Sequence, residues 1–129
     1  MNTIENGAVV ELVDRYIATW NETDPVRRRD LIDRTFTGKA SYLDPVLQGD
    51  GADGIDAMVK AVHEKYPGYK FARTSDVDAH HDRARFSWQL APEAGPVLVK
   101  GIDFATLSAD GRLQTVTGFF TEVATPAQS

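Results

Sequence analysis

The chain has 129 residues, of which 42% are hydrophobic and 26% charged, a length typical of one domain. Its 19 acidic residues outnumber its 14 Lys and Arg residues, and the net charge of −5 argues against a nucleic acid or an anionic membrane surface as the main partner. The absence of Cys excludes disulfides, thiol nucleophiles, Cys-ligated zinc and iron–sulfur clusters. With only three His, chemistry is expected mostly from carboxylates, Tyr, Ser or Thr, or a bound cofactor.

No targeting segment stands out along the chain. No apolar run approaches the ~18–20 residues of a membrane span, so no membrane contact is expected. The first residues lack the basic stretch and apolar core of a signal peptide. We therefore expect a cytoplasmic protein with one domain over residues 1–129.

Three helices are expected in the first half of the chain. Between Glu5 and Asn21, apolar residues recur with the 3.6-residue period of a helix that buries one face. Asp24 is a good N-cap and Pro25 a good first helical residue, which predicts a second helix ending near Phe36. A third helical pattern covers Asp53–Tyr66, where Pro and Gly follow.

The second half changes to the period of two that is typical of strands. The expected strands are Tyr69–Thr74, Arg83–Leu90, Val97–Leu107 and Arg112–Val123, with a short earlier strand at Ala40–Asp44. Helices gathered before antiparallel strands predict an α+β domain. The three N-terminal helices are then expected to pack on a curved, mainly antiparallel sheet and to enclose a pocket with it.

Asp103 is the most informative acid in the expected strands. It lies in the middle of a strand face that is otherwise apolar or small, between Gly101 and Ala105. Asp103 is either satisfied by a neighbouring polar group, or it faces a pocket for which its small neighbours leave space. An unpaired buried carboxylate tends to raise its pKa and stay protonated, and it can then donate a hydrogen bond to a carbonyl oxygen.

Two further residues, Asp44 and Tyr16, are candidates for the same site as Asp103. Alone, Asp44 before Pro45 is typical of a strand end, and Tyr16 is typical of a helix core. Together, Tyr16 in Tyr-Ile-Ala-Thr-Trp-Asn, Asp44 in Leu-Asp-Pro-Val and Asp103 in Ile-Asp-Phe resemble the nuclear-transport-factor-2-like superfamily. Within that superfamily the chain is similar to ketosteroid isomerases and SnoaL-like polyketide cyclases, over nearly all of its length.

The resemblance implies a cone-shaped fold and a reaction without a cofactor. In ketosteroid isomerases a Tyr of the first helix and a strand Asp bind the substrate oxygen, and the Asp of an Asp-Pro pair shuttles the proton. By motif these roles fall on Tyr16, Asp103 and Asp44. The expected reaction is proton transfer next to the carbonyl of a small hydrophobic ligand, with two preorganised donors stabilising the enolate.

Other residues are expected to line the pocket. Val59 stands where many ketosteroid isomerases have a Tyr that extends the hydrogen-bond network, and bulky aromatics predict a narrow cavity. The expected lining residues are Trp20, Tyr42, Val59, Phe86, Trp88, Gly101, Phe119, Phe120 and His80.

The His residues favour acid–base chemistry over metal binding. On an extended strand His80 and His81 would point to opposite faces, and His63 has no helical partner, so no metal site is expected. His80 is a candidate for an extra acid or base, as in some dehydratases and cyclases of the superfamily. Two alternatives therefore remain: a ligand-binding domain without catalysis, or a dehydratase or hydrolase that uses an acid and His80.

A homodimer is also expected. The strand face opposite Asp103 carries Leu98, Ile102 and Phe104, so the strand has apolar groups on both faces that need covering. Dimerisation through the sheet is also what the resemblance implies.

Overall fold

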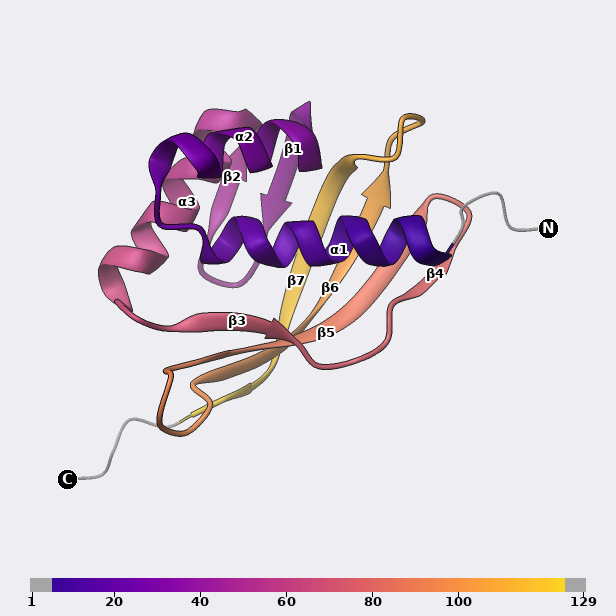
Figure 1. The fold of residues 1–129 in the computed structure, drawn as a ribbon. Helices are drawn as coiled ribbons and strands as arrows, with labels where there is room; N and C mark the ends of the chain where they lie inside the picture. Colours follow the sequence, from indigo (N-terminus) through magenta and orange to yellow (C-terminus); the bar gives the residue numbers. More distant parts are fainter. Residues whose placement is uncertain (1–5, 125–129) are drawn as a thin grey trace.

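The computed structural model describes residues 6–124; the predicted helix start at Glu5 lies outside this range. Three helices precede most of the strands, and α1 lies across the sheet (Figure 1). The helices are α1 (Asn6–Asn21), α2 (Pro25–Thr35) and α3 (Gly51–Lys65). The strands are β1 (Phe36–Leu43), β2 (Gln48–Asp50), β3 (Lys70–Arg73), β4 (Asp78–His80), β5 (Arg83–Ala91), β6 (Val99–Leu107) and β7 (Leu113–Val123).

The helices form for the reasons that the sequence indicates. The apolar stripe of α1 is buried, and its largest members are Tyr16 and Trp20. The side chain of Asp24 accepts a hydrogen bond from the Arg27 backbone N–H at 2.9 Å, so the predicted N-cap of α2 is confirmed.

The seven strands form one mixed sheet in the order β2-β1-β7-β6-β5-β3, with β4 also paired to β5. β1 runs parallel to β7, whereas the other pairs are antiparallel. The three helices pack on one face of this curved, unclosed sheet, which confirms the predicted α+β class and the cone-shaped architecture (Figure 1).

Several boundaries differ from the prediction. The chain passes from α2 directly into β1 at Phe36, four residues before the predicted strand start at Ala40. The three-residue strands β2 and β4 are not among the strands that we expected from the sequence. Gly49 in β2 packs so closely on α3 that a Cβ there would lie 2.8 Å from the Gly54 carbonyl oxygen, which explains the glycine at this position.

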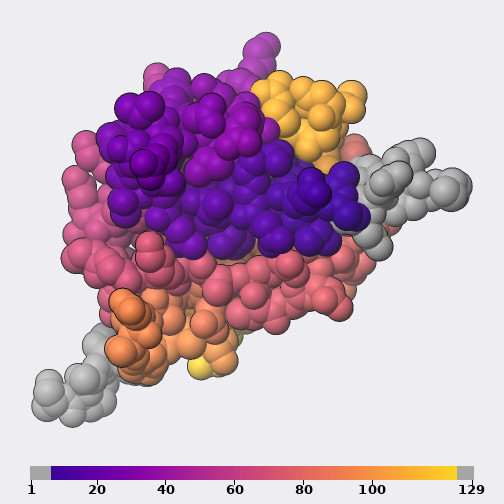
Figure 2. Space-filling model, viewed as in Figure 1, coloured from indigo at the N-terminus to yellow at the C-terminus, as the bar shows by residue number. Residues whose placement is uncertain are grey.

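The sheet has two unlike faces. Its inner face, toward the helices, buries alternate residues of the central strands, as predicted for the Asp103 face of β6. The helices cover much of the molecule as seen in Figure 2. The outer face carries exposed apolar side chains, including Phe104 and Phe119. Among the described residues, no helix is long and apolar enough to cross a membrane.

Candidate functional site

Asp103 lies at the centre of the inner face and is only 2% exposed. Tyr16 of α1 donates a hydrogen bond from its hydroxyl to Oδ2 of Asp103 at 2.7 Å. Trp88 of β5 donates from its indole Nε1 to Oδ1 at 2.9 Å. Of the two interpretations of Asp103, the structure thus shows the carboxylate satisfied by neighbouring side chains, with one donor on each oxygen.

Burial sets the ionisation of this carboxylate. Removal from water raises the pKa of Asp103 to about 6, and the charge of Asp44 adds to the rise, whereas the hydrogen bonds from Tyr16 and Trp88 lower it. Burial and the charge of Asp103 also raise the pKa of Tyr16 well above its ordinary value. Tyr16 therefore stays protonated, and Asp103 exchanges its proton near neutral pH.

Asp44 follows β1 and is held in a tight turn. Its Oδ1 accepts hydrogen bonds from the backbone N–H groups of Val46 and Leu47 at 2.8 and 2.7 Å. Its Oδ2 accepts one from the Tyr42 hydroxyl at 2.6 Å. A carboxylate has about four lone-pair positions, so three donors leave about one for a ligand. Burial and two nearby carboxylates raise the pKa of Tyr42, which keeps this hydroxyl protonated.

Gly118 of β7 brings the two acids together. A Cβ at this position would lie 2.8 Å from Oδ1 of Asp103 and 3.2 Å from Cβ of Asp44. The same Cβ would lie 3.4 Å from the Tyr42 hydroxyl. A side chain larger than that of glycine would therefore clash with the Asp103 carboxylate and crowd Asp44.

A cavity of about 330 Å³ opens on the inner side of the sheet. Asp44 and Lys65 are the charged residues in its wall, which is otherwise apolar and aromatic. The wall comprises Trp20, Tyr42, Asp44, Val46, Leu47, Ala61, Val62, Lys65, Tyr66, Phe71, Trp88, Leu90, Val99, Phe120 and Val123. A carboxylate with a free lone pair in an apolar cavity can accept a proton from a bound molecule.

Tyr16 and Asp103 border a separate space of about 10 Å³. Four aromatic residues line both this small space and the 330 Å³ cavity: Trp20, Tyr42, Phe71 and Trp88. Their rings make edge-on or tilted contacts, for example 5.2 Å between the centroids of Trp20 and Phe71. These aromatic residues lie between the large cavity and the small space beside Tyr16 and Asp103.

The predicted lining residues divide into three groups. Trp20, Tyr42, Trp88 and Phe120 line the large cavity. Val59 and Phe86 are buried core residues outside the cavity wall, and Gly101 lies beneath the Trp88 ring. Phe119 is 52% exposed on the outer face, because adjacent residues of β7 point to opposite sides of the sheet.

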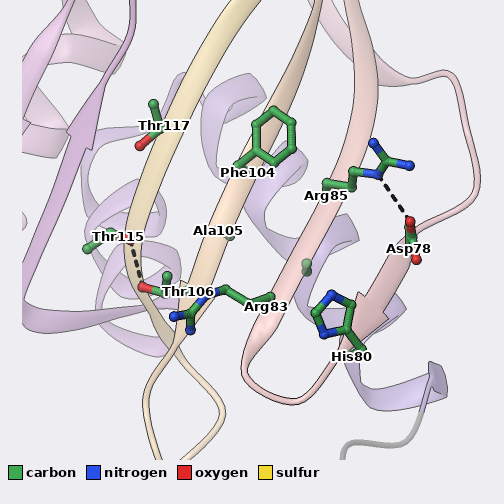
Figure 3. Close-up of a pocket in the computed structure, with 10 residues that line it drawn as sticks. Asp78, His80, Arg83, Arg85, Phe104, Ala105, Thr106, Thr115 and Thr117 are labelled. Atoms are coloured by element: carbon green, nitrogen blue, oxygen red, sulfur yellow. Dashed lines mark hydrogen bonds and ion pairs between the residues drawn. The ribbon is translucent and has the colours of Figure 1, made fainter.

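His80 also lies away from the inner cavity. It is exposed at the end of β4 and borders a hollow of about 590 Å³ on the outer face, with Arg83, Arg85 and Phe104 (Figure 3). His81 follows in a turn with a left-handed φ of 50°, not on an extended strand as we assumed. Within residues 6–124, no group of three or more His, Asp or Glu side chains could hold a metal ion.

Sequence reasoning missed two kinds of feature. The Tyr42–Asp44 hydrogen bond joins two residues that the strand pattern already placed on one face, so the alternation of β1 could have indicated it. Phe71, Tyr66 and Lys65 line the cavity from β3 and the end of α3. Their positions depend on how these elements pack, and no local pattern indicates them.

Comparisons with known proteins agree on one family. The sequence model of the SnoaL-like domain matches residues 13–116. A candidate isomerase of the SnoaL-like family from Agrobacterium tumefaciens is 36% identical, with a TM-score of 0.85 over 90% of this chain and 99% of that one. No curated protein matches the chain.

Two more distant structures share the fold. A candidate SnoaL-like polyketide cyclase from Jannaschia sp. CCS1 is 20% identical, with a TM-score of 0.73 over 94% of this chain and 90% of that one. A candidate polyketide cyclase from Sinorhizobium meliloti is 16% identical, with a TM-score of 0.67 over 89% of this chain and 99% of that one. At these identities the likeness is one of fold.

Proposed function

Because this chain belongs to the SnoaL-like family of nuclear-transport-factor-2-like domains, we propose that it is a cofactor-free isomerase or cyclase. Its reaction is proton transfer next to the carbonyl group of a small apolar ligand. The observation that carries the proposal is Asp44, a fixed carboxylate with a free lone pair in the wall of the 330 Å³ cavity.

Asp44 is the general base in this reaction. It takes a proton from the carbon beside the carbonyl; the electron pair of the broken C–H bond forms a C=C bond, and the π pair of the carbonyl group moves onto its oxygen to give an enolate. The protonated Asp44 then returns the proton to another carbon, which moves the double bond. Tyr42 holds Asp44 in place through its hydroxyl.

Tyr16 and Asp103 are the proposed donors to the substrate oxygen. Tyr16 stays protonated because burial raises its pKa, and a pKa of about 6 keeps about one-tenth of the Asp103 carboxyl groups protonated at pH 7. Two preorganised donors in a dry site stabilise a developing oxygen charge, and loss of one typically costs on the order of 10²–10³ in rate.

Cavity size limits the substrate. Ligand sites commonly measure about 300–1,000 Å³, and 330 Å³ lies at the lower end of that range. Aromatic and aliphatic walls favour an apolar body of one or two rings over a flat steroid.

The test is the conversion of 3-cyclohexen-1-one into its conjugated isomer, followed by ultraviolet absorbance. Because a general base typically contributes 10²–10⁴-fold, Asp44→Asn should lower the rate by about that factor. The control is Asp78→Asn, which removes an acid from the outer hollow and should keep the wild-type rate. Equal rates in wild type and Asp44→Asn would contradict the assignment.

The occupied oxygens of Asp103 favour a second candidate function, a ligand-binding domain without catalysis. In that case 2-naphthol should bind in the cavity, while the protein leaves the isomerisation rate of 3-cyclohexen-1-one at its value in buffer. Acceleration that depends on Asp44 would exclude this alternative.

We also propose that the chain forms a homodimer through the outer face of the sheet. Phe104 and Phe119 are 41% and 52% exposed there, and their rings meet edge-on with centroids 5.8 Å apart. Exposed aromatic pairs on a sheet face favour burial against a partner. Sedimentation equilibrium should give twice the chain mass for wild type and the mass of a single chain for Phe119→Arg. A wild-type protein that sediments as a single chain at all concentrations would refute the dimer.

A further inference from the structure

Trp88 links the two parts of the inner site. Its indole N–H donates to Asp103, while its ring also forms part of the wall of the 330 Å³ cavity. Edge-on contacts hold the ring against Phe71 and Phe120, with centroid distances of 5.6 and 6.1 Å. The ring lies so close to Gly101 that a Cβ there would lie 2.3 Å from its Cζ2 atom.

With Trp88 in this position, no ligand can touch Asp103. The space that Asp103 and Tyr16 border measures about 10 Å³, at the lower limit for a single water. Four aromatic residues line both spaces, and Trp88 is the one among them that donates a hydrogen bond to Asp103. A ligand oxygen that is to bind at Oδ1 of Asp103 therefore has to displace the indole.

We propose that Trp88 is a gate on Asp103: binding of an oxygen-bearing ring compound beside Asp44 displaces the indole, and the ligand oxygen takes its place at the carboxyl group. This inference deepens the proposed function, because it says how the substrate reaches its oxygen-binding donors. Its tests use binding alone, so they do not depend on turnover.

The exchange also changes what Asp103 can do. While the indole N–H donates to Oδ1, this oxygen acts as an acceptor. The bond from Trp88 lowers the pKa of Asp103, so its loss favours the protonated carboxyl group. Departure of the gate therefore turns Asp103 from an acceptor into a donor.

Nuclear magnetic resonance of the indole N–H groups tests the gate directly. The chain has two Trp residues, and a Trp20→Phe variant assigns the remaining indole signal to Trp88. The probe is 2-naphthol, whose two rings and hydroxyl imitate an enol. At saturation, the Trp88 N–H signal should lose its hydrogen-bonded shift and exchange faster with solvent. An unchanged Trp88 signal in the naphthol-bound protein would overturn the proposal.

A pair of variants gives an independent test. Trp88→Phe keeps an aromatic ring but removes the N–H that holds the gate shut. Phe120→Leu is the matched control, because Phe120 lines the large cavity and contacts Trp88 but does not border the space at Asp103. A hydrogen bond to a charged group typically contributes about 1.5 kcal/mol or more, so its removal should tighten 2-naphthol binding about tenfold or more.

The outcomes separate the gate from the reaction. Tenfold tighter binding by Trp88→Phe but not by Phe120→Leu supports the gate, even if no enone is isomerised. Equal or weaker binding by Trp88→Phe overturns it, and so does a failure of both wild type and Trp88→Phe to bind the probe. The isomerisation rate of Asp44→Asn tests the proposed function, and neither result for that rate supports or contradicts the gate.

Discussion

Asp103→Asn should remove a pH-dependent cost of folding. In the folded protein the pKa of Asp103 is about 6, mainly because of burial, against an ordinary value of 3.8 for an exposed carboxyl group. The folded state therefore holds the proton more tightly than the unfolded state. At about 1.36 kcal/mol per pH unit, this difference corresponds to about 3 kcal/mol.

The sign follows from the raised pKa. Below about pH 3.8 the group is protonated in both states, so it contributes no pH-dependent cost. Between about pH 3.8 and pH 6 the unfolded state gives up the proton while the folded state keeps it, so about 3 kcal/mol of stability is lost over this range; above about pH 6 both states are ionised and the cost stays constant. Asn carries no charge; its amide oxygen still accepts from the Trp88 indole, whereas its NH2 group replaces the oxygen that accepts from Tyr16, and this change costs the same at every pH.

Urea unfolding of wild type and Asp103→Asn at pH 4, 5, 6 and 7 measures this effect. The free energy of unfolding of wild type, relative to that of Asp103→Asn, should fall by about 2.4 kcal/mol between pH 4 and pH 7. The comparison between variants cancels the titration of the other acids. A difference that stays constant from pH 4 to 7 would refute the reasoning that burial dominates the ionisation of Asp103.

Two further substitutions probe the same site. Tyr16→Phe removes one of two donors to Asp103, so the free energy of unfolding in urea at pH 7 should fall by about 1.5–3 kcal/mol. The pKa of Asp103, followed by the chemical shift of its carboxyl carbon, should rise above about 6. A variant as stable as wild type would contradict the hydrogen bond. Gly101→Ala places a Cβ 2.3 Å from the Trp88 ring, so the free energy of unfolding should fall by about 1–3 kcal/mol and the indole fluorescence should change. An unchanged fluorescence spectrum would show that the ring does not lie against position 101.

Local patterns predicted those parts of the fold that depend on neighbours in sequence. The helical stripe of α1, the Asp24 cap and the alternation in β6 each arise within a single element, and the structure has all three. The start of β1 at Phe36 depends instead on parallel pairing with β7, where Phe36 lies opposite Leu113. Such a distant partner leaves no local signal, so the strand appeared shorter in the sequence than it is.

The site shows the same division. Alternation placed Asp103 among small and apolar residues on one face, and the resemblance drew attention to Tyr16 and Asp44. The donors to Asp103 come from 87 residues before it and from 15 residues before it, across different elements. Whether the Asp103 carboxylate faces a cavity or a hydrogen-bond donor therefore depends on side-chain packing. In the structure the indole of Trp88 occupies this position.

Hydrogen–deuterium exchange of a ketone tests the central claim most directly, because it isolates the first proton transfer. Cyclohexanone is incubated in D₂O with the wild-type protein or with Asp44→Asn, and loss of the protons next to the carbonyl is followed by proton nuclear magnetic resonance. Wild type should exchange these protons faster than buffer alone, and Asp44→Asn should lose about 10²–10⁴-fold of that acceleration. Exchange at the buffer rate with wild type, or undiminished exchange with Asp44→Asn, would contradict the account.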